Sequence, residues 1–276
     1  MAEITAADVK ALREQTGLPM MECKRALQET GGNQQAAVEW LRKQGIKTKE
    51  TRIGRETTAG RIAVYADVAE GIGAMIELKC ESAPVASSAE FKQFANDLAR
   101  QLAKGPGAKT AEDLLKQPSP SKPGQTLADV RDDMFNRIRE VFNLSRIVRI
   151  TGPCGGYAHH DGSSGALVEV AGGTTEVAKD IAMHIVAQKP QVVTKEDLDP
   201  SAVDKEREIL SAAARREGKP ENIIGKMIEG RLKNFFAEKV LVEQPFVKDE
   251  KLSVGQLAKQ AGMKIVRFVR WELGKE

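Results

Sequence analysis

The residues best suited to chemistry in this sequence are its three histidines, two of which are adjacent. His159 and His160 precede Asp161, a combination that in other proteins binds metal ions or transfers protons. We expect both to lie in a strand, where neighbouring side chains point to opposite faces and do not converge on one ion. His184 stands in a helical, apolar pattern that favours a packed histidine. We therefore predict no metal site, and an enzyme using His159 or His160 is the weakest of the alternatives.

Glycine-rich phosphate-binding motifs are incomplete. The spacing from Gly218 to Gly225 is wrong for a P-loop, and Met227 stands where Ser or Thr is required. Gly71 and Gly73 begin like a dinucleotide-binding turn, but the third glycine is missing. We expect no cofactor, no bound nucleotide and no catalytic residue.

Composition favours a soluble protein that acts on another protein. Among 276 residues, 42 Lys and Arg oppose 39 Asp and Glu, so the net charge of +3 is too small to indicate a dedicated nucleic-acid or membrane binder. Aromatic residues make up only 4%, which argues against base-stacking surfaces. Three widely spaced cysteines suit neither a disulfide framework nor a zinc site. With no signal peptide and no apolar run near the roughly 20 residues of a membrane span, we expect a cytoplasmic protein.

Three short helices are predicted over residues 4–46. Thr5 and Asp8 have the spacing of a capping box, and Asn33 is suited to cap the third helix. We expect that helix to stop at Gly45.

Basic residues are concentrated in segment 42–55, which contains a single acid, Glu50. A solvated linker is one interpretation, and a phosphate-binding arm is the other.

The chain then repeats itself. Tyr65 and the run 73–78 recur as Tyr157 and the run 165–170, a constant separation of 92 positions. Each run alternates in the manner of a strand, so the pattern predicts two copies of one hairpin. The alternative is an accidental similarity between two common β-β-α units.

A loop distinguishes the two copies. Matched helical positions Asp97 and Asp180 are only 83 residues apart, so the first copy has nine extra residues between strand and helix. We assign this insertion to the loop that contains segment 80–86. Because loops on rigid scaffolds often carry function, this segment is the leading candidate site.

Further elements follow from local patterns. Residues 127–144 predict a helix, residues 201–216 begin an antiparallel helical hairpin that turns at 218–220, and residues 240–242 predict a strand. The narrow apolar seam of this hairpin favours one that projects from the body of the protein, and a hairpin packed in the core is the alternative. Residues 264–271 predict a terminal strand with one basic, solvated face.

Several stretches in order along the chain are similar to one family. They are Leu12–Gly17, Met20–Leu27, Met183-His184 with Lys189-Pro190, Lys205–Leu210, Glu229–Leu232 and Glu243–Val247. Together they resemble the translation elongation factor Ts family over nearly the whole chain.

The resemblance implies an α+β fold with several parts. These are an amino-terminal three-helix, ubiquitin-associated (UBA)-like module, a duplicated two-subdomain α/β core with antiparallel sheets, an inserted antiparallel helical coiled-coil hairpin and a short carboxy-terminal module. The boundaries that we predict are 1–54 for the three-helix module, 55–140 for core subdomain N, 141–183 with 229–262 for core subdomain C, 184–228 for the hairpin and 263–276 for the terminal module.

The resemblance also implies a function. It predicts a non-catalytic guanine-nucleotide exchange factor for elongation factor Tu, which promotes GDP release during protein synthesis by disturbing the magnesium and phosphate site of that GTPase. The expected partner is elongation factor Tu in its GDP-bound or nucleotide-free form. Assembly is expected as a heterotetramer with that partner or as a homodimer of this chain. No stable nucleic-acid partner and no membrane are expected. The alternative is a chaperone-like adaptor that binds a partner without exchange.

Candidate site residues transfer position by position. The family's magnesium-displacing loop corresponds to Glu81, Ser82, Ala83, Pro84, Val85 and Ala86. The family commonly has Thr-Asp-Phe-Val-Ala there, so Ala83 and Pro84 replace a carboxylate and an aromatic ring. We expect the position of the loop to be kept, with Pro84 stiffening it and Glu81 as the nearest charge.

Other partner contacts are implied by the same resemblance. They involve Met20, Met21, His160, Arg267, Phe268 and Arg270. Buried core methionines are an alternative for the first two, and His159 replaces His160 if the alignment shifts by one position.

Overall fold

The protein is a mixed helix and sheet chain that divides into two compact units. The computed structural model describes residues 4–50, 54–216 and 221–275. The first unit comprises residues 1–61 and 76–147, and the second comprises residues 62–75 and 148–276. Helices combine with antiparallel sheets, which confirms the predicted α+β class.

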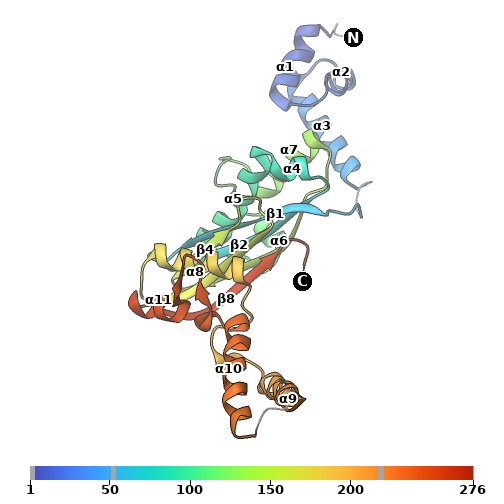
Figure 1. Cartoon of the computed structure of the whole chain (residues 1–276). Coiled ribbons are helices and arrows are strands. Elements are labelled where there is room, and N and C mark those ends of the chain that lie inside the picture. The colour runs from blue at the N-terminus through green and yellow to red at the C-terminus, as the bar shows by residue number, and fades with distance from the viewer. Residues whose placement is uncertain (1–3, 51–53, 217–220, 276) are drawn as a thin grey trace. The chain divides into compact units, whose positions relative to one another are not determined.

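Figure 1 labels most of the elements. Strands β1 (Ala59–Asp67), β2 (Ile72–Cys80) and β3 (Asn143–Thr151) each contribute residues to both units. The first unit also contains α1 (Ala6–Thr16), α2 (Met20–Glu29), α3 (Gln34–Glu50), α4 (Ala83–Ser87), α5 (Ala89–Lys104), α6 (Ala111–Leu115) and α7 (Leu127–Ile138). The second contains β4 (Cys154–Ala158), β5 (Ser164–Ala171), α8 (Thr175–Gln188), α9 (Pro200–Arg216), α10 (Glu221–Lys239), β6 (Pro245–Phe246), β7 (Asp249–Ser253), α11 (Val254–Gln260) and β8 (Lys264–Glu272), with short 3-10 turns at Lys195–Asp197 and Leu241–Glu243. Over the described ranges, no helix combines the length and apolarity needed to cross a bilayer.

The first three helices begin where the sequence predicts. The Thr5 hydroxyl accepts the Asp8 N–H at 3.2 Å, and the Asp8 carboxylate accepts the Thr5 N–H at 3.0 Å, completing the capping box. The Asn33 side chain likewise accepts the Ala36 N–H at 3.0 Å. The helices enclose a small core of Val9, Leu12, Leu18, Cys23, Ala26, Leu27, Ala37 and Leu41.

The third helix is longer than predicted, since α3 continues through Gly45 to Glu50. A Cβ atom at Gly45 would lie 1.8 Å from the side-chain oxygen of Asn136 on α7. Glycine therefore lets the two helices approach closely, and the predicted stop at Gly45 is wrong. The basic segment 42–55 begins as helix, and its residues 51–53 lie outside the described chain.

The two three-stranded sheets have equivalent strand orders, β1-β2-β3 and β4-β5-β8. In each, the second hairpin strand is central and a strand from later in the chain completes the sheet. A longer helix then follows each hairpin, α5 in the first case and α8 in the second. This arrangement agrees with the predicted repeat.

An acid–arginine pair joins the central strand to the third strand in both sheets. Glu77 on β2 is 1% exposed and accepts two hydrogen bonds from Arg146 on β3, at 2.8 and 3.0 Å. Glu169 on β5, 92 positions later, accepts from Arg267 of β8 at 2.6 Å. The second pair lies at the surface, because the Arg267 side chain is 60% exposed.

Helix α7 ends earlier than predicted, at Ile138. Arg139 adopts a left-handed conformation with φ of 65°, and its N–H donates to the carbonyl of Phe135 at 2.7 Å. This C-cap stops the helix, so the expected continuation to residue 144 is wrong. Strand β3 begins at Asn143.

The strand predicted at residues 240–242 is reduced to a single bridge. Val240 pairs with Val192, after which the Glu243 N–H donates to the Val240 carbonyl and closes a 3-10 turn. The prediction is wrong because this turn replaces further pairing.

Helices α9 and α10 pack against each other. Ala214 and Leu232 are the most deeply buried of their side chains in the described part of these helices, each 1% exposed. The predicted turn at 218–220 lies outside the described residues.

The interior of the second unit contains a packed histidine, as predicted. His184 is fully buried, and its Nδ1 accepts the Val247 N–H at 3.2 Å. The proton therefore resides on Nε2, which lies 2.9 Å from Oε1 of Gln244. The Gln244 amide in turn donates to the carbonyl of Glu238 at 3.1 Å. One imidazole thus ties α8 to the segment before β7.

We predict that this histidine makes the second unit sensitive to acid. Burial lowers the pKa of His184, against a smaller opposing effect of the Gln244 hydrogen bond. The unfolded chain, with a histidine pKa of about 6.5, binds the proton first. The contribution of the neutral His184 to the unfolding free energy is therefore complete above about pH 6.5 and is lost as the pH falls below that value. Urea unfolding at pH 7.5 and pH 5.5 measures the loss.

The matched comparison is His184→Gln against His160→Gln, which removes an exposed histidine. We expect a smaller difference in unfolding free energy between the two pH values for His184→Gln only. Equal pH dependence in both variants would contradict this.

A second prediction concerns the two acid–arginine pairs. Glu77→Gln leaves cationic partners beside a buried neutral side chain and should cost about 3 kcal/mol of unfolding free energy. Glu169→Gln breaks a solvated pair and should cost less than about 1 kcal/mol. Urea titration of both variants measures the two losses of unfolding free energy. Equal losses would contradict the conclusion that the Glu77 pair is buried and the Glu169 pair is solvated.

Candidate functional site

The segment that distinguishes the first repeat connects β2 to α5. It is folded rather than irregular, since residues 83–87 form the short helix α4 with Ser82 at its N-cap. Ala83 and Pro84 are exposed, Val85 is half-buried and Ala86 is buried. Pro84 stands in the first turn, where its missing N–H costs no helical hydrogen bond. The segment presents a small, stiff and uncharged tip.

Two carboxylates hold the base of this tip. Glu140, just after α7, accepts the Ser82 N–H at 3.0 Å and the Ser82 hydroxyl at 2.5 Å. Reciprocally, Glu81 accepts the Val141 N–H at 2.9 Å and lies 3.2 Å from Arg55. Both Glu81 oxygens thus have partners within the first unit. Sequence reasoning missed Glu140, because the continuous helical pattern predicted over residues 127–144 gives no signal of such a role.

A buried thiol lies beneath the same segment. The Cys80 Sγ donates to the carbonyl of Ser82 at 3.3 Å. Burial, with the negative charge of Glu140, raises the pKa of the Cys80 thiol to about 11. The thiol is therefore protonated at neutral pH and packs beneath the tip rather than acting as a nucleophile.

Met20 and Met21 are surface residues. They begin α2 and are 51% and 72% exposed, which excludes the alternative of core methionines. Glu22 follows them and forms an ion pair with Arg139, the left-handed residue that ends α7. The methionines and the 81–86 segment thus belong to one unit and are connected through neighbouring residues, Arg139 and Glu140.

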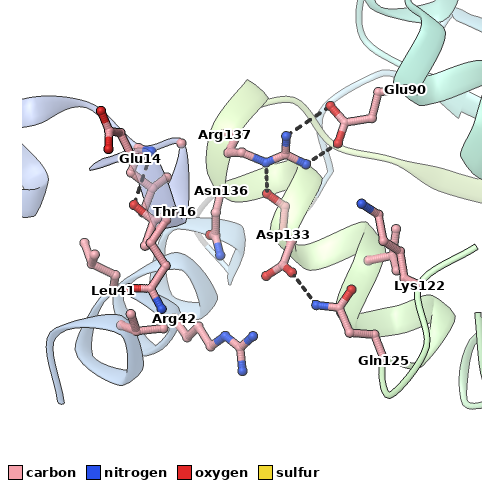
Figure 2. Close-up of a pocket in the computed structure, with 15 residues that line it drawn as sticks. Glu14, Thr16, Leu41, Arg42, Glu90, Lys122, Gln125, Asp133, Asn136 and Arg137 are labelled. Atoms are coloured by element: carbon pink, nitrogen blue, oxygen red, sulfur yellow. Dashed lines mark hydrogen bonds and ion pairs between the residues drawn. The ribbon is translucent and has the colours of Figure 1, made fainter. Parts of the chain in front are cut away.

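A cavity of about 450 Å³ lies between the first three helices and α7. Figure 2 shows Thr16 and Arg42 on one side of it and Asp133 and Arg137 on the other. Two of its charged groups have internal partners, since Arg137 pairs with Glu90 and the Asp133 carboxylate accepts from a glutamine amide at 3.0 Å. The volume of the cavity indicates that this junction is incompletely packed.

The adjacent histidines lie in a turn, not in a strand as predicted. β4 ends at Ala158, and the Gly162 N–H donates to the His159 carbonyl at 2.8 Å to close the turn. The rings of His159 and His160 are therefore close, with centroids 4.3 Å apart. The prediction that they point to opposite faces is wrong because β4 ends at Ala158, before both histidines.

The turn separates the roles of the two histidines. His160 is exposed, while His159 is half-buried and its Nδ1 lies 2.8 Å from Asp161. Although burial acts to raise it, hydrogen bonds from the Ser163 N–H and from His159 hold the pKa of Asp161 well below its usual range. Within the described ranges, no three His, Cys, Asp or Glu side chains are grouped to hold a metal.

A second cavity, of about 400 Å³, opens beside this turn. His159 and Tyr157 line it together with Met183 of α8 and with Val247, which is 39% exposed. The lining combines apolar side chains, among them Met183 and Val247, with polar ones, among them His159 and Lys248.

The residues predicted on the terminal strand are not equivalent. Phe268 packs against one core cluster of the second unit, whereas Val269 and Trp271 pack against another. Strand β8 therefore has no single solvated face, and that prediction is wrong. Arg267 pairs with Glu169 as described, and Arg270 donates to Glu272 at 2.8 Å.

The predicted site residues thus fall into two groups, one in each unit. Residues 20, 21 and 81–86 belong to the first, and residues 160, 267, 268 and 270 to the second. In the second unit, pairing of Ser164 with Glu272 brings the end of β8 to the strand that leaves the histidine turn.

Comparison with known proteins supports the resemblance seen in the sequence. The family model described as Elongation factor TS matches residues 81–275. Elongation factor Ts of Methylococcus capsulatus is 43% identical over 274 residues, covering 99% of this chain and 92% of that protein. Elongation factor Ts of Thioalkalivibrio sulfidiphilus is 40% identical over 275 residues, with 99% and 92% coverage, and that of Aquifex aeolicus is 38% identical over 284 residues, with 98% coverage of each. Because the family model spans most of the chain and these relatives match it almost from end to end, the protein belongs to the elongation factor Ts family.

Proposed function

We propose that the protein is a guanine-nucleotide exchange factor for elongation factor Tu and promotes GDP release during protein synthesis. The observation that carries this proposal is the similarity to elongation factor Ts proteins along nearly the whole chain, including both repeats. Such a factor transfers no chemical group. Its activity depends on surfaces that bind one state of a partner better than another.

The energetic requirement is a difference in affinity. A factor that prefers the nucleotide-free GTPase weakens GDP binding by the same ratio with which GDP weakens binding of the factor. A preference of about 10⁴ requires about 5.5 kcal/mol of differential contact. Since the tip formed by Ala83 and Pro84 is small, we propose that contacts in both units share this requirement.

The 81–86 segment has the most direct role in the proposal. Ala83 and Pro84 offer neither charge nor an aromatic ring, so the tip acts by occupying space near the magnesium and phosphate site. The internal hydrogen bonds of Glu81 and Ser82 support this, because a rigid tip loses little conformational entropy on binding. Glu81 then serves to hold the segment rather than to contact the partner.

The remaining contacts are proposed from the same family comparison. Met20 and Met21 offer exposed, adaptable side chains for a helix of the GTPase. His160, with Phe268 and the arginines at 267 and 270, forms the contact of the second unit.

We further propose the finer organisation implied by the family. Residues 1–54 form a UBA-like module, the two sheets belong to a duplicated core of subdomains 55–140 and 141–183 with 229–262, and residues 184–228 form a coiled-coil hairpin, followed by a terminal module at 263–276. The capped helices α1 to α3 and the packing of α9 on α10 support these assignments. Assembly with the GTPase as a heterotetramer, or through a homodimer of this chain, completes the proposal.

We predict that Ala83→Gly with Pro84→Gly slows exchange. Two glycines loosen the tip while leaving the contacts of Glu81 and Ser82 in place, so GDP release from elongation factor Tu should slow about tenfold, or about 1.4 kcal/mol in activation free energy. Release of a fluorescent GDP analogue measures the rate.

The matched control places two glycines in another five-residue helix of the same unit, as Ala111→Gly with Glu112→Gly in α6. Its release rate should equal that of the unaltered protein. If the wild-type protein binds elongation factor Tu without accelerating release, the molecule is instead the adaptor considered above.

We also predict that Met21→Ser weakens binding to nucleotide-free elongation factor Tu. Losing one buried methionine contact should raise the dissociation constant about fivefold, equivalent to about 1 kcal/mol. Ile209→Ser on α9 removes another exposed apolar side chain and should leave the constant unchanged. Isothermal titration calorimetry measures both dissociation constants. Equal effects of the two substitutions would show that Met21 is not a specific contact with elongation factor Tu.

A further inference from the structure

The two residues that follow α7, Arg139 and Glu140, contact different parts of the first unit. Arg139 has positive φ, which turns the backbone sharply after the helix and separates its side chain from that of Glu140. Apart from glycines, the only other described residue with positive φ is Lys189. An arginine in this conformation bears a strain that glycine would avoid, and its side chain forms the ion pair with Glu22.

Glu140 reaches the 81–86 segment. Its two oxygens accept the N–H and the hydroxyl of Ser82, the residue from which α4 starts. The Val141 N–H returns a hydrogen bond to Glu81. Because of these hydrogen bonds, a displacement of Glu140 and Val141 would also displace Glu81 and Ser82, where the exposed tip begins.

Arg139 reaches the first three helices. Its guanidinium donates to Glu22, which follows the exposed Met21 in the first turn of α2. The pair is only partly exposed, with side-chain exposures of 28% for Arg139 and 42% for Glu22. The methionines and the tip are thus connected through two consecutive residues.

The surrounding junction gives this connection its importance. The 450 Å³ cavity of Figure 2 lies there, with a second cavity of about 110 Å³ between Arg42, Gly45 and α7. Cavities forfeit packing contacts across a junction. The close approach of α3 to α7 at Gly45 and specific bridges, Glu22 to Arg139 among them, therefore share the task of fixing the orientation of the first three helices.

We propose that Arg139 and Glu140 are positioning residues that fix the exposed methionines of α2 relative to the tip at Ala83 and Pro84. This deepens the proposed exchange function and rests on it. With both surfaces held in one orientation, binding at one places the other at its target without a further loss of freedom. Without the bridge, the two surfaces bind as tethered but separately moving parts.

A partner-free measurement tests the bridge directly in the full-length protein. Backbone ¹⁵N relaxation should give one rotational correlation time for α1 to α3 and for α5 in the wild-type protein. In Arg139→Gln, the value for α1 to α3 should fall below that of α5. Arg131→Gln is the matched control, because Arg131 lies on α7 and pairs with the adjacent Asp132.

Exchange kinetics provide the functional test. Arg139→Gln should raise the concentration that gives half-maximal GDP release about tenfold, as expected when linked contacts become independent. The limiting rate should change much less, because the tip is still held by Glu140. Charge exchange, Glu22→Arg with Arg139→Glu, should restore the half-maximal concentration, whereas a loss of general stability would not be rescued.

Unchanged relaxation in Arg139→Gln, or independent motion already present in the wild-type protein, would overturn the proposal. Failure of the charge exchange to restore either measurement would do the same. If elongation factor Tu shows no exchange with any variant, the proposed function fails, while the relaxation data still decide whether the bridge exists.

Discussion

The pairing of β2 with β3 is the constraint on which the candidate site of the first unit depends. Glu77 and Arg146 anchor this pairing from a buried position. The 81–86 segment leaves the end of β2, and the residues that hold it, Glu140 and Val141, lead into β3. The reciprocal hydrogen bonds between these two segments therefore continue the strand pairing beyond the sheet. A rigid surface tip results from an interaction several residues away in the interior.

Much of the fold follows from local signals in the sequence. The capping box at Thr5, the Asn33 cap and the alternation of both hairpins are short-range features whose energetics need no tertiary context. Predictions failed where a residue serves another segment. Gly45 resembles a helix end, but it makes room for Asn136. Arg139 resembles the interior of a helix, but it ends one, since no sequence rule assigns a left-handed conformation to arginine.

The candidate site was predictable in position and not in its supporting contacts. Comparing the two repeats locates the extra segment after β2, because an insertion is visible in residue spacing alone. Glu140 is 58 residues from Ser82, and an unaligned sequence carries no signal that joins them. The histidine turn shows the opposite limit. There, β4 ends at Ala158, so neither histidine has the strand conformation in which side chains alternate, and the inference about ring orientation fails.

The buried thiol beneath the tip has a chemical consequence. Cys80 and Cys154 both have raised pKa values, about 11 and about 12, chiefly because of burial. Peroxide and other electrophiles react with thiolates, so both sulfurs are protected by protonation as well as by lack of access. The exposed tip itself consists of Ala83 and Pro84, which have no oxidisable side chain. This surface should therefore keep its shape under oxidative stress, when proteins that expose reactive cysteines are inactivated.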